Sequence, residues 1–246
     1  MIFLKANFMK KILFFILLYT HLTFVFAQKD CQIIYKIEAT EDFFEKEDPD
    51  MHGYDKKINE AIKNHASNFS FLLKINGDES YFQSVKTMSN DNDDLNYKLA
   101  SAILQSNLKY YLNVSTREKL TEVEAYGKKF IILDSINDWE ITKEQKKIGN
   151  YTCYKAVTKK VSLNNEGTFI SDIIVWFTTD LPYSFGPIGY GGLPGLILEL
   201  QDGTIKYKLE KIKYLNKLKI TKPVKGELVT DKELLEIGKK ATEIRG

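Results

Sequence analysis

The sequence predicts a mainly β fold (α+β), with a strongly curved antiparallel sheet or half-open barrel and one or two short helices. Apolar and polar residues alternate in many short segments, as they do where one face of a strand is buried. Turn signals separate these segments by roughly 8–15 residues, which favours an antiparallel sheet over βαβ units. Between two segments lies a loop rich in glycine and proline, residues 178–195, which exceeds the roughly 12–15 residues of an ordinary connection.

The elements follow from these patterns in chain order. Alternation or a short apolar run between turn signals predicts strands at 31–38, 69–75, 80–85, 109–114, 120–125, 130–133, 139–141, 148–161, 168–177, 196–200 and 205–214. Apolar residues at helical spacing predict short helices within 48–64, 95–108 and 231–245. The first strand has the strictest pattern, because Cys31, Ile33, Tyr35 and Ile37 share one face.

The two strands after the glycine-rich loop differ in regularity. Residues 196–200 form an apolar run, which is typical of a central strand, and Asp202-Gly203 supplies a tight turn. In the returning strand, 205–214, the apolar residues up to Leu209 alternate so that they share one face. Ile212 breaks this alternation and would lie on the opposite face. This slip predicts a β-bulge around Glu210-Lys211.

Residues 1–27 are expected to be a secretory signal peptide. Lysines precede an apolar run over 12–26, and Val25 and Ala27 are the small residues of a cleavage site. The run is shorter than the roughly 20 residues that a transmembrane helix needs. We therefore expect an exported protein, periplasmic, secreted or associated with the outer membrane, that does not span the membrane after cleavage.

Charge and composition exclude nucleic acid as a partner. Of the 35 basic residues, three lie within residues 1–27, and the rest nearly balance the 33 acidic residues. Affinity for nucleic acid comes largely from neutralising phosphates, and an evenly mixed surface offers no basic patch for this. With 43% hydrophobic residues, the composition is that of a globular protein.

Cys31 and Cys153 are the only cysteines. Export would place them where disulfides persist, and a bridge that closes so long a loop would stabilise the fold. Two buried free thiols fit the same apolar surroundings. A disulfide and a pair of free thiols both stay open, because sequence does not show whether the two Cα atoms come close enough.

The segment from Trp176 to Leu200 is the most informative part of the chain. It holds five of the 14 glycines and three of the five prolines. Glycine reaches positive φ or permits close backbone approach, while proline fixes φ, so together they specify a shaped loop. The aromatic residues within the loop argue against disorder.

A W-F-T-x-x-L-P-x-S-x-G-P segment from Trp176 leads into Gly192-Leu193-Pro194-Gly195-Leu196-Ile197. This run resembles the signature of the GLPGLI family, bacterial secreted or envelope proteins named for the hexapeptide. The similarity extends to Asp138-Trp139 and to residues 146–156. It implies that residues 28–246 are a single GLPGLI-type domain ending in a helical tail, 224–246. The resemblance provides no catalytic residues.

The predicted site is the lining of this loop. The residues are Trp176, Tyr183, Phe185, Gly186, Pro187, Tyr190, Gly192, Leu193, Pro194 and Gly195. They would form a concave apolar site at the open end of the sheet, and we expect it to bind a hydrophobic ligand or an envelope protein. The alternative is that these side chains plug the sheet and form its core.

A hydrolase is the second function class. Ser184 would be its nucleophile, or Asp172, Asp180 and Glu199 would supply acid–base carboxylates. However, no G-x-S-x-G elbow is present, and 33 acidic residues make chance neighbours common. We therefore favour a non-catalytic protein.

Neither a metal nor a cofactor is expected. His52 and His65 lack the spacing of a zinc site, and the acidic run 91–94 lacks the glycine and glutamate of an EF-hand. The glycine-rich loop leads into a strand, whereas phosphate loops lead into a helix and carry a lysine nearby.

Overall fold

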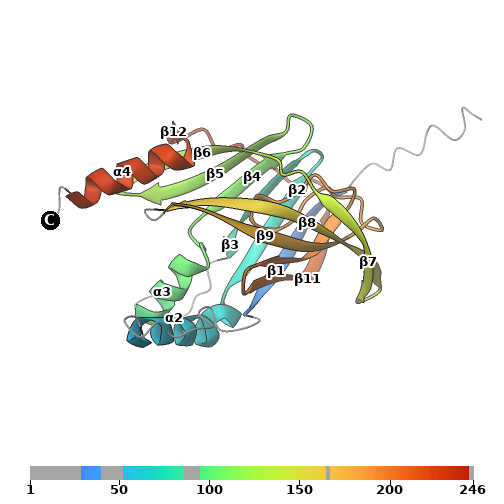
Figure 1. Ribbon diagram of the computed structural model, residues 1–246. Helices are drawn as coiled ribbons and strands as arrows, with labels where there is room; N and C mark the ends of the chain where they lie inside the picture. The colour runs from blue at the N-terminus through green and yellow to red at the C-terminus, as the bar shows by residue number, and fades with distance from the viewer. Residues whose placement is uncertain (1–28, 40–51, 86–94, 165–166, 244–246) are drawn as a thin grey trace, which may run out of the picture.

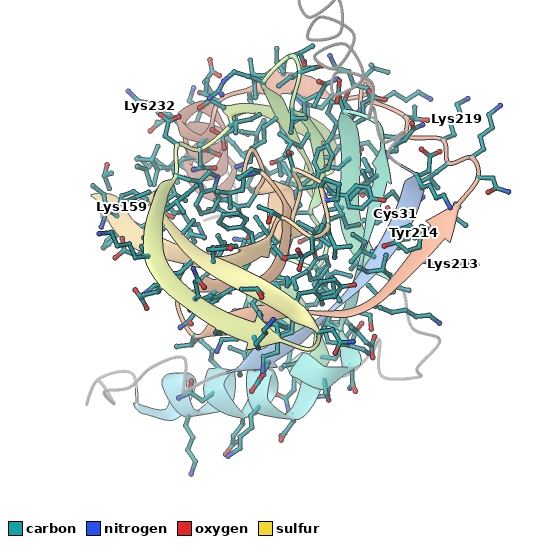
Figure 2. The ribbon with its side chains drawn as sticks, turned by 90° about the vertical axis from the view of Figure 1, so that its right-hand side faces the viewer. Cys31, Lys159, Lys213, Tyr214, Lys219 and Lys232 are labelled. Atoms are coloured by element: carbon teal, nitrogen blue, oxygen red, sulfur yellow. The ribbon has the colours of Figure 1, made fainter. Side chains whose placement is uncertain are left out.

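The computed structural model describes residues 29–39, 52–85, 95–164 and 167–243. In these residues the chain forms one twelve-stranded sheet and three short helices (Figure 1). The sheet curves strongly, and Figure 2 shows side chains filling the space that it encloses. The predicted mainly β fold with a curved antiparallel sheet is therefore confirmed.

The strands are β1 (Asp30–Ala39), β2 (Ser70–Asn76), β3 (Glu79–Val85), β4 (Lys109–Asn113), β5 (Glu118–Ala125), β6 (Lys128–Ser135), β7 (Glu140–Ile148), β8 (Tyr151–Asn164), β9 (Gly167–Thr178), β10 (Leu196–Asp202), β11 (Ile205–Leu215) and β12 (Glu227–Val229). The helices are α2 (His52–His65), α3 (Leu95–Ile103) and α4 (Asp231–Glu243), with 3-10 turns η1 (Ala66–Asn68) and η3 (Pro187–Gly189).

The chain builds the sheet from its middle outwards. The strand order is β12-β6-β5-β4-β3-β2-β1-β11-β10-β9-β8-β7, so β1 to β6 form a meander that leaves the centre. The chain then crosses to the far end, starts β7, and returns through β8 to β11, which pairs with β1. Neighbours are antiparallel except β12, which runs parallel to β6. Sequential pairing of this kind explains why turn signals predicted most of the strands.

The predicted bulge is present at its expected place. Ile34 of β1 pairs with Lys211, whereas the next residue, Tyr35, pairs with Leu209, so Glu210 is the extra residue. The bulge lets β11 keep apolar side chains on the inner face on both sides of the slip.

The main core fills the inner face of the sheet. Aromatic side chains dominate its centre, where Phe71 stacks on Phe82 at 5.3 Å and meets Tyr207 edge-on at 5.5 Å between ring centroids. Tyr35 is fully buried beside them. These positions follow from the period-two pattern of β1, β2, β3 and β11.

A smaller cluster lies on the outer face and guides the end of the chain. Tyr111, Leu120 and Ile131 are buried there, and Ile220 packs on them. The segment after β11 therefore crosses the outer face and delivers β12 to the edge of β6. Helix α4 follows directly and reaches β8 at the opposite end of the sheet.

Sequence patterns misjudged β7, β8, β12 and one face of α3. Strand β7 extends through the polar residues 142–147, which were not expected to be strand, and 148–161 is not one strand because a turn at Gly149 separates Ile148 from β8. Strand β12 was missed within the predicted helical tail. In α3, Ala100 is buried, whereas Leu95, an apolar residue of the helix predicted within 95–108, is 77% exposed.

Both cysteines are free, buried thiols. Cys31 lies on β1 next to Tyr214 of β11 (Figure 2), and Cys153 lies on β8. Three strands, β11, β10 and β9, separate β1 from β8 in the sheet. Of the two alternatives left open by the sequence, the structure therefore has the free thiols.

The predicted signal peptide, residues 1–27, lies outside the described residues and stays a prediction, as does export. The acidic loop 89–94 and the start of the helix predicted within 48–64 also lie outside them. Among the residues that the structure describes, no helix is long and apolar enough to cross a bilayer.

Candidate functional site

The glycine-rich loop crosses the interior of the curved sheet. It leaves β9 and returns to β10 on one wall, while its turn η3 packs on β3, β4 and β5 of the opposite wall. Residues 178–195 therefore tie together two parts of the sheet that are distant along the strand order.

Close backbone approach explains why glycine is needed at the end of the loop. A Cβ atom on Gly195 would lie 2.0 Å from the carbonyl oxygen of Thr178, where the two ends of the loop meet. At Gly191 a Cβ atom would lie 2.6 Å from Cδ2 of Leu112 on the opposite wall. Both positions lack space for any side chain, so close packing fixes the path of the loop backbone.

Hydrogen bonds from distant residues hold the loop and the start of β10 in place. Trp139 Nε1 donates to the Gly191 carbonyl at 2.9 Å, and the Tyr35 hydroxyl donates to the Ile197 carbonyl at 2.6 Å. Within the loop, the Gly192 amide donates to the Ser184 carbonyl at 2.9 Å. These bonds satisfy backbone carbonyls that the surrounding core removes from water.

The predicted site residues lie mostly in the interior. The buried members are Tyr183, Phe185, Gly186, Pro187, Tyr190, Leu193 and Gly195, while Gly192 and Pro194 are exposed. Trp176 is half-buried, with the Lys146 ammonium 4.5 Å from its ring centroid. Their side chains thus serve the core, as in the alternative interpretation, and a binding role for the loop stays a prediction.

One loop residue has an unusual backbone conformation. Ile188 in η3 has φ 46° and ψ 39°, the left-handed region that β-branched residues strongly avoid. Such strain costs about 1–3 kcal/mol and persists only where the surroundings enforce it, often at functional sites. Nothing in the sequence singled out Ile188, because strain at one residue depends on how the folded loop is packed.

Ile188 and Tyr190 border a cleft of about 440 Å³, which we call the seam cleft. Its walls include the inner faces of β4, β5 and β6, the strand β8 and the helix α4. Central lining residues are Lys119, Asp134, Ile188, Tyr190, Leu234 and Leu235. A second hollow of about 280 Å³ shares Gln105, Lys160 and Ile188 with it, so the two adjoin.

A capping box positions α4 over the cleft. The Thr230 amide donates to Glu233 Oε2 at 2.7 Å, and the Glu233 amide donates to Thr230 Oγ1 at 3.2 Å. This reciprocal pair fixes the start of a helix. As a result Asp231, Leu234 and Leu235 face the cleft.

Three carboxylates share two ammonium groups in the cleft and its adjoining hollow. Lys119 Nζ lies 3.0 Å from Asp134 and 4.9 Å from the ring centroid of Tyr190, and its side chain is only 8% exposed. Lys160 Nζ lies 2.6 Å from Asp202. Asp231 is exposed on one side, and partial burial of its carboxyl raises its pKa; nearby Asp134 adds to this rise and Lys119 opposes it. One carboxylate is therefore in excess, which favours a cationic group on a ligand.

The residues considered for hydrolysis do not all come together, although Glu199 and Asp180 both lie near Cys153. Glu199 forms an ion pair with Lys146 and lies opposite Trp176, whereas Asp172 pairs with Lys159 in the middle of β9. Asp172 and Trp176 are four residues apart, about 13 Å along a strand. Ser184 is half-buried within the loop. In the described ranges, no three His, Cys, Asp or Glu side chains form a metal-binding group.

Sequence reasoning missed most of the seam cleft. Lys119 and Asp134 are direct cross-strand partners on β5 and β6, a relation that appears only once the register is known. Asp231 joins them from a helix a hundred residues further along. The pattern of β5 gave no usable signal, because its apolar residues Leu120 and Val123 lie on opposite faces of the strand.

Fold and loop together define a class of protein: an open, strongly curved antiparallel sheet whose interior is filled by a glycine-rich loop. A family described as proteins of unknown function (Porph_ging) matches residues 139–172 and 164–199. These ranges run from Trp139 through the loop to β10, the region that carries the GLPGLI resemblance. No curated protein matches the chain.

The solved structure of PNGF-II in space group C2 is similar, with a TM-score of 0.51 and 17% sequence identity. The likeness covers 87% of this chain and 33% of PNGF-II, so this chain spans about a third of that protein. At this identity the likeness shows a shared fold and nothing about activity.

Proposed function

We propose that this chain is an exported, non-catalytic binding protein of the bacterial cell envelope, and that its ligand occupies the seam cleft. The observation that carries the proposal is the strained Ile188, which a tightly packed loop holds at the wall of this cleft. Backbone strain of this kind clusters at functional sites, where the surrounding structure holds it in place.

The cleft suits a ligand with an apolar body and a polar end. Ile188 and Tyr190 line the cleft together with Leu234 and Leu235 of α4, while the ion pair of Lys119 and Asp134 joins β5 and β6. Pockets of this kind combine apolar walls with a few placed polar groups. A hydrophobic ligand with a polar head and an apolar segment of an envelope protein both meet this description.

The binding test uses residues 28–246 and the apolar dye N-phenyl-1-naphthylamine, whose fluorescence rises on burial. We expect saturable binding by the wild type and at least about tenfold weaker binding by Leu234→Trp, because the larger side chain fills the cleft. Leu228→Trp is the matched control, since Leu228 is 64% exposed on β12 and does not line the cleft. Absent dye binding, or equal affinity in all three proteins, would overturn the proposal.

Export is tested by the N-terminus of the protein made in a bacterial host with a periplasm. Cleavage by signal peptidase should leave Gln28 as the first residue of protein released by osmotic shock. Edman sequencing or intact mass of that fraction measures this directly. Full-length protein that still carries residues 1–27 and stays in the cytoplasm would contradict export without affecting the binding test.

A further inference from the structure

The curved sheet leaves a seam between its two ends. Strand β6 ends at Ser135 and β7 begins at Glu140, so the connection between the two ends of the sheet is very short. A chain of this length spans at most about 18 Å. The end of β6 and the start of β7 are therefore close in space, although four strands separate β6 from β1 and four more separate β1 from β7.

Part of β8 has an open edge at this seam. Pairing with β7 ends at Val157, and β8 then continues to Asn164 with β9 as its partner. Within the described residues, no strand pairs with the other edge of 158–163. Figure 1 shows this end of β8 and β9 running out beneath α4, which contacts β8.

The open edge of β8 faces the seam cleft. Lys160, Val161, Ser162 and Leu163, four consecutive residues, all line the cleft. Side chains alternate between the two faces of a strand, so consecutive residues line one cleft only when the strand turns its edge to it. Backbone N–H and C=O groups of β8 are therefore part of the cleft wall.

We propose that the seam cleft binds an extended polypeptide segment of a partner protein, which adds to the sheet as a strand along residues 158–163 of β8. The inference rests on the proposed binding function and names its ligand class. Strand addition is a common mode of peptide recognition, in which main-chain hydrogen bonds give affinity and alternate side chains give specificity. The open edge would pair about 20 Å of extended peptide.

The open edge favours a peptide over a lipid-like ligand. A hydrocarbon chain against β8 would bury backbone N–H and C=O groups without hydrogen bonds, which is costly. A peptide strand satisfies them. An exposed apolar surface also continues beyond the cleft onto β9. Val161 of the cleft wall lies directly opposite Ile170, and the two residues are 60% and 67% exposed.

Charge specifies one further feature of the peptide. The excess carboxylate among Asp134, Asp202 and Asp231 favours a basic residue at one end of the segment. We therefore expect alternating apolar residues, which pack against Ile188 and Leu234, with a lysine or arginine at one end.

The test uses a defined heptapeptide library in which Val, Ile, Leu, Phe or Tyr alternates with Thr and one end carries Lys. Affinity selection on the wild-type chain 28–246, followed by fluorescence anisotropy, should yield a binder. Two versions of the binder are then made, one N-methylated at the odd-numbered amides and one at the even-numbered amides. The version whose blocked amides pair with β8 should bind at least about tenfold more weakly than the unmodified peptide. Unchanged affinity after N-methylation in both versions would overturn strand addition.

Protein variants test the charge and the alternative occupant. Asp231→Asn should reduce the preference for Lys over Thr at the peptide end, while Glu236→Gln, an exposed change on the same helix, should not. If no library peptide binds while the naphthylamine dye still does, the peptide inference fails and the binding function stands. A stable dimer that Val161→Lys dissociates would also overturn it, because a second copy then occupies the edge.

Discussion

Trp139 shows how one residue outside the loop controls the loop's shape. It lies in the short connection before β7, donates to the Gly191 carbonyl at 2.9 Å and meets the Tyr190 ring edge-on at 5.9 Å. A buried carbonyl without a donor costs about 1–3 kcal/mol, so this bond keeps the middle of the loop inside the core.

Replacing Gly195 with alanine should lower the free energy of unfolding by about 1–3 kcal/mol. The φ angle of Gly195 is not positive, so the cost comes from space: the added Cβ would lie 2.0 Å from a backbone oxygen that cannot rotate away. Urea unfolding measures the change.

The matched control for this change is Gly53→Ala in α2, where nothing lies within 4 Å of an added Cβ. Alanine favours a helix over glycine, so this variant should be neutral or slightly more stable. Equal losses in the two variants would contradict the packing explanation.

Elements with a clear apolar period were predictable, and those without one were not. The phase slip between Leu209 and Ile212 located the bulge at Glu210, because a buried face must be preserved across it. Strand β7 lies at the edge of the sheet, where residues 142–147 are largely exposed and polar. No period marks such a strand, and only its pairing with β8 identifies it.

The candidate site was predictable only as far as the loop. Glycine and proline indicated a shaped segment, but the sequence could not say that Tyr183 and Phe185 point into the core and leave Ile188 to the cleft. That outcome depends on which wall the loop meets. The seam cleft joins β5, β6, β8 and α4, elements far apart in the chain, so local patterns carry no sign of it.

The order in which the chain builds the sheet explains why a cleft exists at all. Growth outwards from β1 in both directions ends in β12 and β7, and these two strands pair with only part of β6 and of β8. The unpaired remainders of β6 and β8 both line the seam cleft, because the sheet curves enough to bring them close without pairing. The loop then fills the interior, and α4, delivered over the outer face, reaches β8 across the seam. An open margin is an aggregation risk that proteins often cover with a helix or loop, and α4 does this in part through its contact with β8.

Alkaline pH should destabilise the whole fold. Burial raises the pKa of Cys31 and of Cys153 from 9.0 to about 11, and raises those of Tyr35 and Tyr207 well above 10.0. The unfolded chain therefore loses these protons first, and the free energy of unfolding falls as pH rises from about 9 towards 11. Urea midpoints across this range measure the fall.

A cysteine-free variant separates the two contributions to this fall. The double variant Cys31→Ala with Cys153→Ala should be less stable than the wild type at neutral pH, because packing is lost. Between about pH 9 and 10 its free energy of unfolding should fall less than that of the wild type, because the tyrosines of the unfolded chain still keep most of their protons there. Identical slopes in wild type and variant would show that neither thiol titrates, as in a disulfide. Alkylation of the denatured, unreduced chain tests independently whether the thiols are free. Both cysteines react if they are free thiols, and neither reacts if they form a disulfide.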